Sequence, residues 1–63
     1  AATIEFDGRS IDCVVRNISA TGAAFDVSGP IPPTVTLNFV TSRERQHCFI
    51  VWRQQRRVGV TFN

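Results

Sequence analysis

The chain has 63 residues, 43% of them hydrophobic, which indicates one small folded domain rather than a disordered segment. No apolar run approaches the roughly 20 residues that a membrane-spanning helix needs, and no signal peptide is visible. The formal net charge is +2 and all seven basic residues are arginines, a charge excess too small to favour general nucleic-acid binding.

Apolar and polar residues alternate with a period of two along most of the chain, which predicts a series of short β-strands. Asp7-Gly8 separates the first two strands and is typical of a type I′ hairpin turn. Three prolines before Thr34 predict a loop, and no segment has helical periodicity. The predicted strands are Thr3–Phe6, Ser10–Arg16, Ala24–Val27, Thr34–Val40, His47–Arg53 and Arg57–Phe62. Strands of this length and spacing predict an all-β barrel or sandwich.

The fifth predicted strand has two apolar faces. Because Arg53 prefers solvent, we expect Cys48, Ile50 and Trp52 to face the core. Trp52 is then a core residue rather than a stacking platform. Phe49 and Val51 are left at least partly exposed, and an apolar outer patch around Phe49 is either a docking surface or is covered by a missing helix or neighbouring domain. We expect the arginines at 53, 56 and 57 to form a solvated hairpin tip rather than a binding patch.

Catalytic and metal chemistry find little support in the sequence. Cys13 and Cys48 lie in apolar alternating runs, so we expect two buried free thiols in a reducing cytoplasm. His47 is the only histidine, and the carboxylates are scattered, so we expect no metal, no cofactor and no enzymatic activity.

The stretch from Asn17 to Ala23 reads N-I-S-A-T-G-A and follows an alternating run. Asn17 and Ser19 are two residues apart, so in an extended chain both point to one face. Gly22 permits a positive φ or a close approach to the backbone. These residues form either a small ligand pocket at a strand end or a structured turn, since Asn, Ser and Gly are also common turn residues.

This stretch resembles the D/N-x-S-x-x-G-G/A signature of PilZ domains, which are bacterial receptors for cyclic di-GMP. The segments Val51-Trp52-Arg53 and Arg57–Phe62 are similar to the closing hairpin of that family. The resemblance implies a six-stranded antiparallel β-barrel of the split-barrel type over residues 1–63, with cyclic di-GMP as ligand and no catalysis. The ligand-binding residues that it implies are Asn17, Ser19, Gly22 and Ala23, together with the adjacent Arg16.

The family's second signature, an R-x-x-x-R segment before the first strand, has no counterpart upstream of Asn17. We therefore expect the chain to be truncated at its N-terminus and to bind cyclic di-GMP weakly by itself. In its intact form the domain would be a cytoplasmic receptor or adaptor that acts on an unidentified protein partner, with no DNA, RNA or membrane partner. The main alternative is a PilZ-like protein-interaction module that binds no nucleotide. A small nucleic-acid-binding barrel ranks third, because exposed aromatics interleaved with basic residues are not evident.

Overall fold

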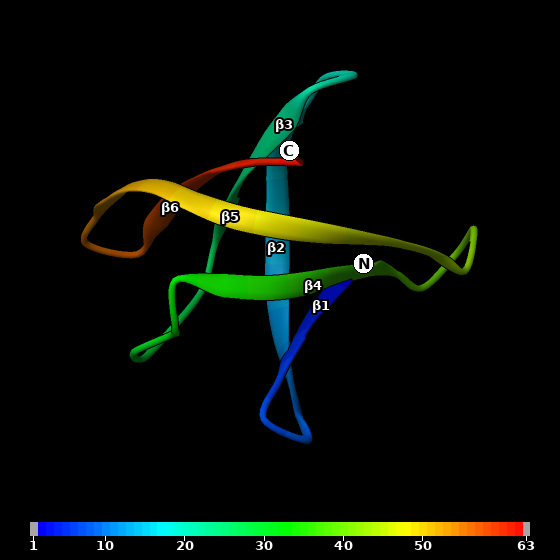
Figure 1. Ribbon diagram of the computed structural model, residues 1–63, viewed down its shortest axis with the longest axis horizontal. Helices are drawn as coiled ribbons and strands as arrows, with labels where there is room; N and C mark the ends of the chain where they lie inside the picture. Colours follow the sequence, from blue (N-terminus) through cyan, green and yellow to red (C-terminus); the bar gives the residue numbers. More distant parts are fainter. Residues whose placement is uncertain (1, 63) are drawn as a thin grey trace.

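A computed structural model describes residues 2–62, which form six antiparallel strands closed into a barrel (Figure 1). The expected segment before Ala1 lies outside these residues. The strands are β1 Ala2–Phe6, β2 Arg9–Ile18, β3 Gly22–Asp26, β4 Thr34–Phe39, β5 Glu44–Gln54 and β6 Arg57–Thr61. Around the barrel they follow the order β1-β2-β3-β6-β5-β4. The described residues include no helix that is long and apolar enough to cross a membrane.

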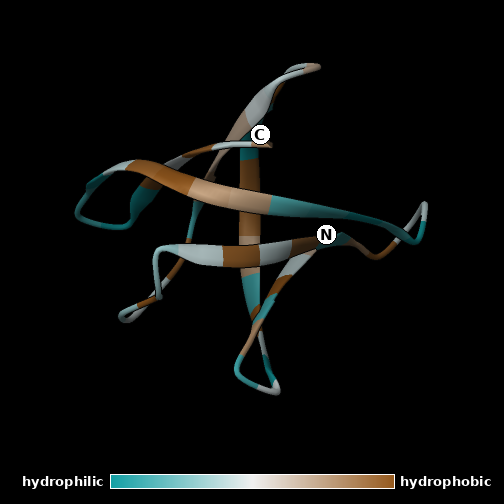
Figure 2. Cartoon of the chain, viewed as in Figure 1, coloured by the Kyte–Doolittle hydropathy of each residue, from teal (hydrophilic) through white to brown (hydrophobic). Residues whose placement is uncertain are grey.

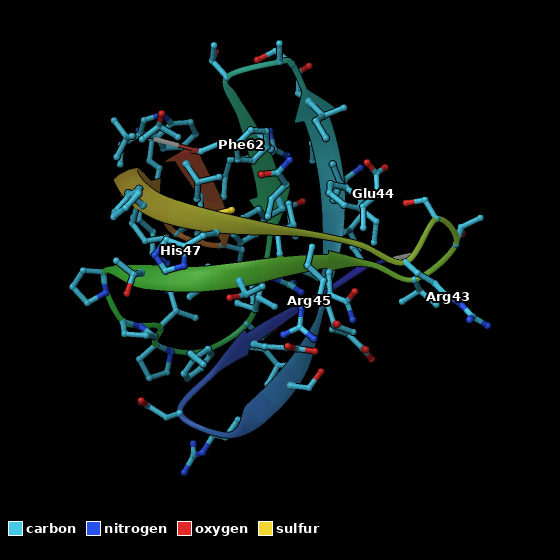
Figure 3. The ribbon with its side chains drawn as sticks, turned by 45° about the vertical axis from the view of Figure 1, so that its right-hand side comes forward. Arg43, Glu44, Arg45, His47 and Phe62 are labelled. Carbon is cyan, nitrogen blue, oxygen red and sulfur yellow. The ribbon has the colours of Figure 1, made fainter. Side chains whose placement is uncertain are left out.

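The inward-pointing residues of the strands form one core. The largest fully buried side chains are Phe25, Ile4, Leu37, Val58 and Cys48. Figure 2 shows that hydrophobic residues occupy the second half of β5, whereas its first half, toward the β4–β5 turn, is hydrophilic. The core therefore lies away from that polar turn, where Arg43 projects at the outer end (Figure 3).

Several strand boundaries differ from the prediction. β2 continues to Ile18, so Asn17 lies in a strand instead of a loop, and β3 begins at Gly22 rather than Ala24. β5 begins at Glu44 because its polar first residues pair with β4, from Phe39↔Glu44 onward. The type I′ prediction at Asp7-Gly8 agrees with the structure, since both residues have positive φ.

Two β-bulges break the alternation of side chains, one in β2 and one in β5. In β2, Val15 pairs with Phe25 but Asn17 pairs with Ala24, so Arg16 is an extra residue. In β5, Ile50 pairs with Val60 but Trp52 pairs with Gly59, so the residue at position 51 is extra. Each bulge shifts the following residues to the other face of the sheet.

The prediction that Trp52 faces the core is therefore wrong. Strict alternation would continue the inward series of Cys48 and Ile50 to Trp52, but the bulge after Ile50 turns its indole to the outside, where it is 47% exposed. By the same rule Asn17 would have followed Cys13 and Val15 inward, and the bulge in β2 places it outside.

Cys13 and Cys48 are buried free thiols, as predicted. Burial is the main cause that raises the pKa of Cys13 from 9.0 to about 11, with smaller contributions from the charges of Asp12 and Cys48. Burial also raises the pKa of Cys48.

We expect iodoacetamide to label both thiols slowly at pH 8, because alkylation needs an exposed thiolate. A pKa rise of two units alone lowers the thiolate fraction of Cys13 by roughly 100-fold. Mass spectrometry after timed labelling measures the rate, with the urea-unfolded chain as control. Equal rates in the folded and unfolded chains would contradict the burial of the two thiols.

Candidate functional site

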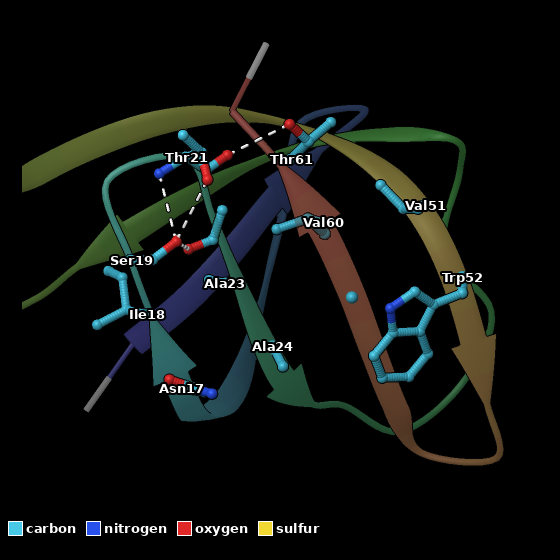
Figure 4. A pocket seen from close by; sticks show the side chains of 12 residues that line it. Asn17, Ile18, Ser19, Thr21, Ala23, Ala24, Val51, Trp52, Val60 and Thr61 are labelled. Carbon is cyan, nitrogen blue, oxygen red and sulfur yellow. Dashed lines mark hydrogen bonds between the residues drawn. The ribbon is translucent and has the colours of Figure 1, made fainter.

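A shallow pocket with a volume of about 390 Å³ lies on the outer wall of the barrel (Figure 4). Its floor is formed by β3 and β6, and the ends of β2 and β5 border it on either side. Its lining residues are Asn17, Ile18, Ser19, Thr21, Gly22, Ala23, Ala24, Val51, Trp52, Gly59, Val60 and Thr61.

Strand pairing places four of the lining residues in one continuous row across the wall. Asn17 pairs with Ala24, Ala24 pairs with Gly59, and Gly59 pairs with Trp52. Ala24 keeps the middle of the row low, while the amide of Asn17 stands at one end and the indole of Trp52 projects from the other end toward β6 (Figure 4). The two bulges are what bring these ends to the same outer face.

Trp52 lies directly over Gly59. A Cβ atom built on Gly59 would meet the indole ring at 2.2 Å, so this position has room for hydrogen only. The indole thus covers the glycine backbone and forms one side of the pocket with its remaining exposed surface.

The turn between β2 and β3 is held by Ser19. Its backbone N–H donates to the carbonyl of Gly22 at 2.8 Å, and its hydroxyl accepts from the backbone N–H of Thr21 at 3.3 Å. Thr21 in turn offers its carbonyl to the backbone N–H of Phe62 at 2.9 Å and to the Thr61 hydroxyl at 3.2 Å. The motif therefore forms a structured turn, which was one of the two predicted possibilities. The same turn forms one rim of the pocket.

Gly22 is required because the backbone is approached closely at this position, and not because a positive φ is needed. Its φ is not positive, but a Cβ at this position would meet the carbonyl oxygen of Val60 at 2.3 Å. A glycine thus allows β3 and β6 to approach closely under the pocket. Ala23 has no positive φ either, so alanine fits at this position without backbone strain.

Four of the five residues predicted to bind ligand come together around the pocket, namely Asn17, Ser19, Gly22 and Ala23. The amide of Asn17 makes no hydrogen bond to any side chain or backbone group in residues 2–62, so it remains available to a ligand. Arg16 lies outside this pocket and lines a neighbouring one of about 370 Å³.

Arg16 is held by an ion-pair cluster centred on Asp26. The Arg16 Nε donates to Asp26 Oδ2 at 2.8 Å, and the Arg57 Nε donates to Asp26 Oδ1. The hydrogen bonds from Arg57 and then from Arg16 lower the pKa of Asp26 from 3.8 to about 2. Asp26 is therefore ionised throughout the physiological pH range.

We expect the stabilising effect of Asp26 to be constant above pH 5 and to disappear only in strong acid. A carboxyl whose pKa falls on folding stabilises the folded state fully above its unfolded value, here 3.8, and this contribution is lost as the pH falls through about 2. Urea unfolding of the wild type and of Asp26→Asn at pH 7, 5 and 2.5 tests this. A stability difference already lost at pH 5 would contradict the lowered pKa.

Sequence reasoning missed Trp52, Ala24 and Gly59 as parts of the site. One signal was present: a two-residue turn at positions 55 and 56 pairs Gln54 with Arg57 and therefore Trp52 with Gly59. A glycine opposite a tryptophan marks a place where the ring can lie flat on the neighbouring strand.

The pocket suits a flat, neutral, hydrogen-bonding group. None of its lining residues is charged, and an aromatic face, an amide and hydroxyl groups surround a low floor. The part of the chain that the structure describes holds no group of His, Cys, Asp or Glu side chains suited to a metal ion. His47 is not among the lining residues; it packs edge-on against Phe49, with the ring centroids 5.0 Å apart.

The chain is thus a small closed β-barrel domain with a pocket on its outer wall. The family model described as PilZ domain matches residues 1–63, and the chain belongs to this family. PilZ domains are non-catalytic and form a family of cyclic di-GMP receptors. Neither the curated proteins nor the solved structures contain a significant match to this chain.

Proposed function

We propose that this domain binds cyclic di-GMP, with one guanine base lying in the pocket between Asn17 and Trp52. The observation that carries the proposal is the row Asn17–Ala24–Gly59–Trp52. It combines a free amide, a low floor and an aromatic side chain in a domain of a receptor family.

The chemistry of guanine fits these side chains. The Asn17 amide oxygen can accept from the ring nitrogens of guanine, and the Ser19 hydroxyl lies on the same rim and can donate or accept. The indole of Trp52 offers an apolar face for stacking, which is worth about 1–3 kcal/mol per base. Arg16, which is outside the pocket, does not take part in holding the base.

We further propose that the chain by itself binds cyclic di-GMP weakly. The pocket lining contains no arginine, and cyclic di-GMP carries two phosphates. Two missing charge-assisted hydrogen bonds of about 1.5–3 kcal/mol each amount to roughly 3–6 kcal/mol, or about a hundred- to ten-thousand-fold in affinity.

Calorimetry with cyclic di-GMP tests both parts. Asn17→Ala should weaken binding about three- to tenfold, and Asn17→Asp should strengthen it, because a carboxylate makes stronger hydrogen bonds to guanine N–H donors than an amide does. An added N-terminal segment carrying arginines in an R-x-x-x-R spacing should raise affinity by at least a hundredfold. Sub-micromolar binding by the unmodified chain would contradict the weak-binding proposal, and an unchanged affinity in both Asn17 variants would contradict the site.

The receptor role includes a protein partner and a cytoplasmic location. Two buried free thiols are compatible with a reducing compartment. Ligand binding can signal only if the bound and free domains differ in their affinity for the partner, so the mechanism is a shift between two populations.

A protein-interaction module that binds no nucleotide is the second candidate. It is favoured by six large hydrophobic side chains exposed on the barrel: Val14, Ile18, Val40, Phe49, Val51 and Trp52. The calorimetric experiment separates the two functions, because a module of this kind shows no heat with cyclic di-GMP even when the arginine segment is added.

A further inference from the structure

The net positive charge of the chain is concentrated beside the pocket. Four of the seven arginines lie at the bulge of β2, at the β5–β6 hairpin and at the start of β6, where only two carboxylates accompany them. The remaining three arginines are balanced by three carboxylates elsewhere, so this surface carries the whole formal charge of +2. Its charged residues are Arg16, Arg53, Arg56, Arg57, Asp12 and Asp26.

The Asp26 cluster lies beside the pocket floor, in a second row of outward side chains that contains the pair Asp26 and Arg57. Asp26 is two residues after Ala24 on β3, and Arg57 is two residues before Gly59 on β6, so both side chains share the outer face with the floor. Residues two apart in a strand are separated by roughly 7 Å, which is within the reach of an arginine side chain. Arg16 is the bulged residue that directly precedes Asn17.

Both arginines keep donors that the cluster does not use. A guanidinium has five N–H donors. Within residues 2–62, Arg16 uses only its Nε toward Asp26, and Arg57 uses its Nε and Nη2. Their side chains are about half exposed, so the remaining donors face solvent beside the pocket.

An incoming anion can displace Asp26 as the partner of Arg16 and Arg57. Exposed ion pairs are weak because water and salt screen them. A phosphodiester presents two oxygens in a geometry that suits bidentate arginine contacts. A nucleotide whose base occupies the pocket would bring such a group to the adjacent row.

We propose that Arg16 and Arg57 form a phosphodiester-binding site beside the base pocket, and that Asp26 occupies this site as an internal anion in the free domain. This inference deepens the proposed function and depends on it for the identity of the nucleotide. The anion site itself follows from the cluster alone. It also implies that the affinity for phosphate is limited, since an incoming anion must compete with Asp26.

Titrations of the full chain with pyrophosphate and with cyclic di-GMP test the inference, with the arginine Nε–H resonances followed by ¹H–¹⁵N NMR. Removing the internal anion in Asp26→Asn should tighten pyrophosphate binding by roughly three- to tenfold at 0.1 M salt. The matched control is Glu5→Gln, which removes one carboxylate from the Arg45–Glu5 ion pair; Arg45 lies near the start of β5 (Figure 3). It should change affinity by less than about twofold, because screening weakens the effect of a distant charge. Far-UV circular dichroism shows whether both variants are folded.

Pyrophosphate should shift the Nε–H resonances of Arg16 and Arg57, and cyclic di-GMP should shift these together with Asn17 and Trp52. Weaker or unchanged pyrophosphate binding in Asp26→Asn would overturn the inference, as would cyclic di-GMP shifts at Asn17 and Trp52 without any at the two arginines. If cyclic di-GMP shifts none of these residues while pyrophosphate shifts both arginines, the proposed function fails but the anion site stands. If neither ligand produces shifts, both fail.

Discussion

Replacing Phe25 by alanine is expected to remove most of the stability of the domain. Phe25 is the largest fully buried side chain, 0% exposed, and sits on β3 between the pocket-floor residue Ala24 and the anion-cluster residue Asp26. Truncating a buried phenylalanine costs about 3–5 kcal/mol. A domain of 63 residues has a total stability of roughly 3–9 kcal/mol, so most of it would be lost.

Phe49→Ala is the matched control, because Phe49 lies on the outer face and is 40% exposed. Its loss should cost about 1 kcal/mol. Urea unfolding followed by far-UV circular dichroism compares the two variants. Similar losses of stability in both would contradict the inward and outward assignment of the faces.

The second large effect is expected from Gly22→Ala. The added Cβ would meet the carbonyl oxygen of Val60, a backbone atom that cannot move without separating β3 from β6. Overpacking of this kind costs roughly 1–3 kcal/mol, and the separation would also deform the pocket floor.

Gly59→Ala adds the same atom but meets a side chain, the indole of Trp52. We expect the indole to swing away, so stability should change little while the fluorescence of the single tryptophan shifts to longer wavelength. Thermal unfolding and emission spectra of the two variants check the pair. A stable Gly22→Ala variant, or an unshifted emission maximum in Gly59→Ala, would contradict the packing described for these glycines.

The alternation of residues was sufficient to predict six strands of a barrel or sandwich, and the family resemblance selected the antiparallel barrel. The inward positions of Ile4, Leu37, Val58 and Cys13 follow from the alternation directly. Alternation works here because each strand has one face in the core and one in solvent.

The two bulges could not be predicted in the same way. A bulge inserts one residue without any required sequence signal, and it reverses the face of every residue that follows in the strand. This is why Trp52 was assigned to the core, and why its place in the same outer row as Asn17 was missed. The motif indicated one rim of the pocket, while the opposite rim depended on a pairing register 35 residues further along the chain, from Asn17 to Trp52.

Chemical-shift mapping of cyclic di-GMP on the ¹⁵N-labelled chain tests the central claim most directly. The account predicts that the ligand, added up to millimolar concentration, shifts the Asn17 side-chain amide, the Ser19 backbone amide and the Trp52 indole N–H together, along one binding curve. Shifts confined to the opposite wall around His47 and Thr36, or no shifts at all even with the arginine segment added, would contradict it.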